Sequence, residues 1–255
     1  MWIYVALFLM LPLIAIVLMA GFADATWTAM SKGKELPYSL GAFILFSYSV
    51  LCGYVASENI FFSYAALFYA TVIWTIGFYC DKNDCFAMQP FKIKHPVMIV
   101  MGTTAALFSW YILWRSETLG IINLATTILV FLVFPLVCKV ANEKPLRLWK
   151  VSLLFLIMSC FFIEVPAFTD VLYGVTVLYI VFVLEGEGQA SFGINGALLV
   201  GTMMAIWFVS VINTPVYLLL VLLVFAYMGM LFFKKTRGLQ MPFFRWIENL
   251  GLRDK

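Results

Sequence analysis

Charged side chains are scarce in this sequence, and long stretches have none at all. Asp, Glu, Lys and Arg together make up 11% of the 255 residues, whereas a soluble domain contains roughly 25%. Apolar residues make up 64% of the chain, and the mean hydropathy is +1.02. A helix needs about 20 apolar residues to cross a hydrocarbon layer of about 30 Å, and such segments occupy nearly all of the sequence. The composition excludes an ordinary soluble domain and predicts an all-α, polytopic membrane helix bundle.

Histidine and cysteine, common ligands of transition metals, are also rare. His95 is the single histidine, and the five cysteines contain no Cys-x-x-Cys pair. The sequence has no Gly-x-Ser-x-Gly, no His-Glu-x-x-His, no phosphate-binding loop and no dinucleotide fingerprint. We therefore expect no metal site and no cofactor. The net charge of +3 follows from the loops described next, so it does not indicate a nucleic-acid partner.

The few basic residues follow a regular pattern along the chain. All 16 except Arg115 lie in alternate gaps between the apolar segments. Lys and Arg gather in cytoplasmic loops because their translocation is disfavoured. The pattern therefore predicts an outer N-terminus and a cytoplasmic C-terminus, in a plasma or inner membrane. It divides the chain into about nine spans, at residues 2–22, 39–56, 60–80, 97–114, 119–138, 151–168, 171–185, 193–212 and 216–233. The seventh is the shortest, and a segment of that length could also dip into the membrane without crossing it.

Residues 234–255 form a second region, separate from the transmembrane bundle of residues 1–233. A basic run, Lys234-Lys235-Thr236-Arg237, precedes a segment in which aromatic and apolar residues alternate with polar ones. This pattern predicts a short amphipathic helix on the cytoplasmic surface of the membrane. Basic residues at that surface attract anionic lipid, so membrane lipid is an expected partner.

The eighth span carries a face of small residues. Gly193, Ala197, Gly201 and Ala205 recur at every fourth position. Small residues at this spacing allow two helix backbones to approach closely inside a membrane. The face predicts close helix packing, either within the chain or in a homo- or hetero-oligomer.

Several acidic residues lie on the predicted cytoplasmic side, where they contribute little to topology. The turn Leu184-Glu185-Gly186-Glu187-Gly188-Gln189 contains two of them and no base. One interpretation is a solvated turn made by the two glycines. Another is a catalytic centre in which Asp24 acts with Glu185 or Glu187, because paired carboxylates can share a proton and activate water. A third is a divalent cation held by Asp81 and Asp84.

The second interpretation has a partial resemblance to a known family. Asp24 at the end of the first span, Leu36-Pro37 after it, and Gly186-Glu187-Gly188-Gln189 before a glycine-rich helix are loosely similar to prepilin peptidases. The resemblance covers these short patches and implies a membrane protease with paired aspartates. Gln189 stands where that family has its second catalytic aspartate, and the patches are further apart than in the family, so we do not assign the chain to it.

Polar residues inside the predicted spans are the remaining candidates for a binding site. Glu164 lies about one turn from the outer end of the sixth span, and Pro166 would free a carbonyl beside it. Threonines recur near mid-depth, at Thr71, Thr104, Thr127, Thr176 and Thr202. Asn123 lies one helical turn from Thr127. Threonine hydroxyls in helices usually bond a carbonyl of the preceding turn. The alternative is a neutral polar path for a weakly polar solute.

Three classes of function are compatible with these features. The first is a transport or translocation component for a small or weakly polar solute, and it best fits a small bundle without a soluble domain. The second is an enzyme at the cytoplasmic face that acts on lipid or peptide through the interfacial carboxylates. The third is a non-catalytic subunit of a membrane assembly. Whether the chain is an enzyme is not decided by its sequence.

Overall fold

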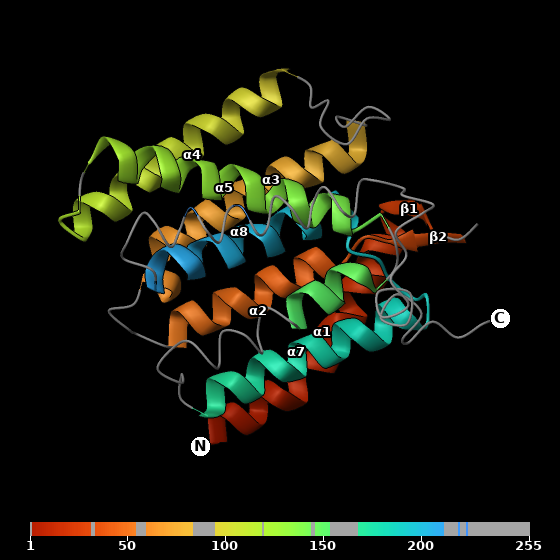
Figure 1. The fold of residues 1–255 in the computed structure, drawn as a ribbon. Helices are drawn as coiled ribbons and strands as arrows, with labels where there is room; N and C mark the ends of the chain where they lie inside the picture. Colours follow the sequence, from red (N-terminus) through yellow and green to blue (C-terminus); the bar gives the residue numbers. More distant parts are fainter. Residues whose placement is uncertain are drawn as a thin grey trace, which may run out of the picture.

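The fold consists mainly of long apolar helices that lie side by side (Figure 1). The computed structural model describes residues 2–31, 34–54, 60–83, 95–118, 120–143, 146–153 and 168–211, with Leu219 and Leu223. Seven long α-helices lie within these residues: α1 (Trp2–Asp24), α2 (Leu40–Tyr54), α3 (Tyr64–Asn83), α4 (His95–Arg115), α5 (Ile121–Ala141), α7 (Phe168–Gly186) and α8 (Gly193–Val211). A 3-10 turn, η1 (Ile60–Phe62), precedes α3. The expected all-α class fits this architecture.

Three of the described helices are long and apolar enough to cross a membrane. Their apolar stretches are Pro96–Arg115 in α4, Ile121–Ala141 in α5 and Gly193–Ser210 in α8. Shorter apolar stretches occur in α1, α2 and α7. Large apolar side chains are exposed on the outward faces, for example Val17 (69%), Phe68 (72%) and Leu107 (68%). Such a surface is typical of a protein that contacts lipid.

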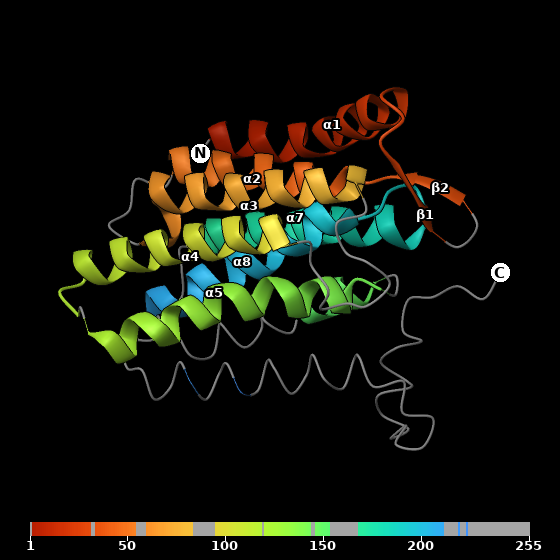
Figure 2. The same cartoon turned by 90° about the horizontal axis from the view of Figure 1, so that it is seen from above.

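The helices run alternately in opposite directions. In Figures 1 and 2, α1, α3, α5 and α7 run toward one end of the bundle, and α2, α4 and α8 run away from it. We call this end the hairpin end, because it carries the two β-strands, and the other the opposite end. The sixth predicted span would restore the alternation between α5 and α7, but only its first helical residues, 147–153, are described.

A β-hairpin follows α1, where the predicted spans leave only a loop. Strand β1 (Thr28–Ser31) pairs antiparallel with β2 (Lys34–Pro37), in a register that sets Thr28 opposite Pro37. The hairpin packs on the end of α3 through aromatic rings. The Trp27 ring lies 4.8 Å from the Phe78 ring, centroid to centroid, and the Lys82 ammonium lies 5.1 Å from the Trp27 centroid. Edge-to-face rings and a cation over an aromatic face stabilise this contact.

Helix α8 lies at the centre of the described bundle. Of the residues in its apolar stretch, 67% are buried, against 39% in α4 and 44% in α5. It packs mainly on α3 and α5 and also on α2. The core around it includes fully buried large side chains such as Phe43, Phe131 and Phe134.

The small residues of α8 allow these neighbours to approach. A Cβ atom added to Gly201 would lie 2.5 Å from the Cα of Pro135 in α5, closer than side chains and backbone normally approach. Ala197 and Ala205 of the same face are fully buried. The part of the face around Gly201 is therefore filled by α5 of the same chain.

Candidate functional site

The hairpin end contains a buried junction built around the first turn of α8. The Asp81 carboxylate, in the last turn of α3, accepts two backbone hydrogen bonds there. Its Oδ1 accepts from the N–H of Ile194 at 2.7 Å, and its Oδ2 accepts from the N–H of Asn195 at 2.9 Å. The first N–H groups of a helix have no partner within the helix, and they favour a negative charge. Asp81 thus caps α8 from a helix more than 100 residues earlier in the chain.

Gly193 opens α8 in a conformation that disfavours any other residue. Its φ is +62°, and an added Cβ would lie 2.7 Å from the Cβ of Tyr38 and 2.9 Å from Oδ2 of Asp81. Its carbonyl accepts a hydrogen bond from Nδ2 of Asn142, just after α5, at 2.9 Å. Glycine is required both for the left-handed backbone and for the close approach of Asp81.

Asn195 occupies the interior of the junction. Its side chain is fully buried, and Nδ2 donates to the carbonyl of Tyr38 at 3.3 Å. Two glycines make room for it: a Cβ on Gly41 would lie 2.5 Å from its Oδ1, and a Cβ on Gly77 would lie 2.5 Å from its Cα. The hairpin, α2, α3 and α8 therefore meet here with their backbones in near contact.

The environment of Asp81 changes its acidity. Asp81 lies just beyond the apolar segment 60–80. Burial raises its pKa from 3.8 to about 6, although the hydrogen bonds from Ile194 and Asn195 lower it. Both oxygens are already used by α8, and Asp84, the second residue of the predicted cation site, lies outside the described residues. In the part of the chain that the structure describes, no three His, Cys, Asp or Glu side chains are grouped as metal ligands.

The three acidic residues predicted to be catalytic lie in different environments at this end. Asp24 is exposed in the last turn of α1, and Glu187 is exposed just after α7. Glu185 is buried, with 9% of its surface exposed. Gly188, at φ +65°, ends α7 together with a hydrogen bond from the N–H of Gln189 to the carbonyl of Leu184. Helices commonly end at a glycine in this conformation, which explains why the turn has a glycine at position 188. The paired-carboxylate centre stays a prediction.

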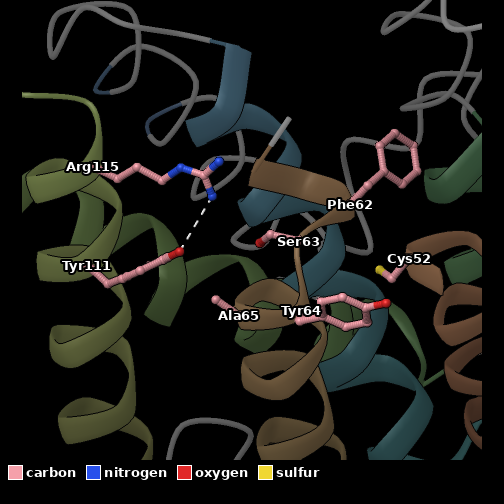
Figure 3. A pocket seen from close by; sticks show the side chains of 7 residues that line it. All are labelled: Cys52, Phe62, Ser63, Tyr64, Ala65, Tyr111 and Arg115. Carbon is pink, nitrogen blue, oxygen red and sulfur yellow. Dashed lines mark hydrogen bonds between the residues drawn. The ribbon is translucent and has the colours of Figure 1, made fainter. Parts of the chain in front are cut away.

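A second feature, a pocket of about 320 Å³, lies at the opposite end of the bundle, between α2, η1, α3 and α4. Figure 3 shows its lining: Cys52, Phe62, Ser63, Tyr64, Ala65, Tyr111 and Arg115. The Arg115 guanidinium donates to the Tyr111 hydroxyl at 3.5 Å. The Ser63 hydroxyl accepts from the N–H of Ala66 at 3.2 Å and so caps α3. The lining combines hydroxyls and a cation with aromatic rings, and it includes no carboxylate.

This pocket is missing from the sequence-based predictions, although one signal pointed toward it. Arg115 is the single basic residue that departs from the charge pattern. That departure identifies Arg115 as unusual, but it does not reveal that the ends of α2 and α4 and the start of α3 lie together. Ligand pockets in proteins generally have volumes of about 300–1,000 Å³, and this one lies at the lower end of that range.

The mid-depth threonines mostly bond within their own helices. The hydroxyls of Thr71, Thr104, Thr176 and Thr202 each donate to the carbonyl four residues earlier, at 2.8–2.9 Å. Thr71 is exposed on α3, and the neutral polar path stays a prediction. Thr127 differs, because it is fully buried and its hydroxyl has no hydrogen-bond partner in the described structure.

The remaining predicted residues are distributed as follows. Asn123 lies in the first turn of α5, where its Nδ2 donates to the carbonyl of Thr118 at 2.8 Å and stabilises the α4–α5 turn. Glu164 and the predicted surface helix within residues 234–255 lie outside the described residues.

No protein-family profile, curated protein or solved structure matches this chain.

Proposed function

We propose that the chain is an integral membrane protein that serves as a transport or translocation component for a small, weakly polar solute. The pocket at the opposite end carries this proposal. Three helices and η1 line it, it offers hydroxyl groups and the Arg115 guanidinium beside aromatic rings, and its volume is about 320 Å³. Pockets between the helices of a bundle are common binding sites.

The proposed topology has about nine spans and places the hairpin end in the cytoplasm. Two observations support it. The described helices alternate in direction (Figures 1 and 2). The hairpin side holds the described basic residues that belong to the β-hairpin, to the last turns of α3 and α5, and to the segment 146–153. Arg115 lies at the opposite end. In a plasma or inner membrane, the pocket would then face the outside.

Filling the pocket tests the proposed function. Ala65→Trp places a large ring among the lining residues, whereas Ala125→Trp places the same ring on the exposed face of α5. The protein is reconstituted in vesicles, and the uptake of glycerol, urea and erythritol is measured by light scattering. We expect wild-type flux above that of empty vesicles, a loss of most of that flux in Ala65→Trp, and little change in Ala125→Trp.

Two results would contradict the proposal. One is wild-type vesicles that take up none of the three solutes faster than empty vesicles. The other is an Ala65→Trp variant that inserts and folds like Ala125→Trp and still conducts like the wild type.

A further inference from the structure

Three buried hydroxyl groups lie on the neighbouring helices α3, α4 and α5. They belong to Tyr69 (3% exposed), Ser109 (0%) and Thr127 (0%). None of the three oxygens has a hydrogen-bond partner in the described part of the structure. By contrast, Thr126, the neighbour of Thr127 on α5, donates to the carbonyl of Ile122 at 2.8 Å. The unbonded state is therefore not a general property of hydroxyls in this bundle.

Aromatic contacts bring the three helices together at this point. The Tyr69 ring is stacked on the Phe108 ring, with centroids 4.5 Å apart, and lies 5.3 Å from the Phe131 ring. The Phe108 and Phe131 rings are also 5.3 Å apart. Ser109 is the residue after Phe108, and Thr127 lies one helical turn before Phe131, on the same face of α5.

The three residues also lie at similar distances from the ends of their own helices. Tyr69 is five residues from the start of α3, Ser109 is six residues from the end of α4, and Thr127 is six residues from the start of α5. All three of these helix ends lie at the opposite end of the bundle. At 1.5 Å per residue, each hydroxyl-bearing residue lies about 7.5–9 Å along its own helix from that terminus.

Buried hydroxyls without partners are costly, and they are rare in folded proteins. Serine and threonine can avoid the cost by bonding a carbonyl of the preceding turn, as Thr126 does. Ser109 and Thr127 do not. Three such groups on adjacent helices indicate a shared partner, because a buried water molecule typically makes about three hydrogen bonds.

We propose that Tyr69, Ser109 and Thr127 form an internal site for a small, neutral, hydrogen-bonding molecule, either water or the hydroxyl group of a small solute. Each hydroxyl can both donate and accept, which suits a neutral guest of the same kind. The buried charged residues of the described structure, Arg147 and Glu185, belong to the hairpin end, so the site offers no charge to hold an ion.

Stacked aromatic rings connect the internal site with the pocket. The Tyr111 ring, which lines the pocket, is stacked on the Phe108 ring with centroids 6.3 Å apart. Phe108 in turn is stacked on Tyr69. The claim that this site is the inner part of a solute path rests on the proposed function. The claim that it holds water does not.

Thermal unfolding in detergent tests whether the hydroxyls have a guest. If they do, Thr127→Val breaks a hydrogen bond to it and lowers the Tm by several degrees. If they have none, the same change removes an unpaired polar group and raises the Tm. Tyr69→Phe combined with Thr127→Val should lower the Tm by less than the sum of the single effects, because both bind one guest. Thr126→Val is the matched control, and its hydroxyl bond is local, so it should not couple with Tyr69→Phe.

Radiolytic hydroxyl-radical labelling then reports the guest directly. Bound water generates radicals beside the residues that hold it, so Tyr69 should be modified in wild-type protein despite its burial, and much less in Thr127→Val. A fall in Tyr69 labelling in glycerol, but not in sucrose of the same radical-scavenging capacity, identifies the solute as the guest, and equal labelling in the two solutions identifies water. An unlabelled Tyr69 together with a raised Tm in Thr127→Val overturns the site. If vesicles show no flux but Tyr69 is labelled, the transport function fails and the site stands.

Discussion

Two opposing effects act on the carboxylate of Asp81. The hydrogen bonds from Ile194 and Asn195, at the positive end of α8, favour its ionised form, and burial disfavours it. Burial is the larger effect and raises the pKa to about 6. The junction that orders the start of α8 is therefore built around a carboxylate whose charge is costly at neutral pH.

This conflict predicts a pH-dependent stability. The pKa of Asp81 is higher in the folded protein than the ordinary 3.8. The contribution of the protonated side chain to the free energy of unfolding is therefore fully present below about pH 4 and is lost as the pH rises through about 6. The free energy of unfolding in detergent should fall over this range by up to about 3 kcal/mol on this account. Asp81→Asn should flatten the profile, whereas Asp24→Asn, which removes an exposed carboxylate from α1, should preserve it. A profile in Asp81→Asn as steep as that of the wild type would refute the assignment to Asp81.

Among the helices, α8 depends most on close backbone packing against its neighbours. It has α2, α3 and α5 around it, and its glycines and those of α2 and α3 permit backbone contact. Gly201 is the tightest point along α5, because Pro135 and the carbonyl of Phe134 lie within 2.7 Å of the position that a Cβ would take.

Gly201→Ala should therefore force α5 and α8 apart and cost about 1–3 kcal/mol, as overpacking of a core does. Gly174→Ala in α7 is the matched control, because a Cβ there would have no atom within 4 Å. The control should be neutral or slightly stabilising, since alanine favours a helix more than glycine does. Thermal unfolding of both variants in the same detergent measures the difference. Equal melting temperatures would show that α5 and α8 do not need this close approach.

The helices could be predicted from the sequence because their lengths follow from long uncharged segments. The predicted span 193–212 corresponds to α8 at 193–211, and the span 97–114 corresponds to α4 at 95–115. The hairpin was missed, because Thr28–Ser31 and Lys34–Pro37 are too short to show an alternating pattern. The junction was missed for another reason. Asp81 was considered as an acidic residue at the end of a span, but its partners Ile194 and Asn195 are distant in the chain, and only the folded structure brings them together.

For the whole molecule, one arrangement explains both the charge pattern and the fold. The charge pattern sets alternate loops on one side of a membrane. The described helices, in turn, bring the corresponding loops to one end of the bundle (Figures 1 and 2). The pocket, Arg115 and the buried hydroxyls lie toward the other end, so the orientation decides from which side a solute reaches them.

The orientation is the central claim, and reporter fusions test it most directly. Alkaline phosphatase, which is active only outside the cytoplasm, and a green fluorescent protein, which fluoresces inside, are each fused after Glu117 in the α4–α5 turn, after Gln189 in the α7–α8 turn, and after Lys255. We predict phosphatase activity without fluorescence after Glu117, and fluorescence without phosphatase activity after Gln189 and Lys255. Glu117 and Gln189 on the same side of the membrane, or Glu117 inside and Gln189 outside, would contradict the account.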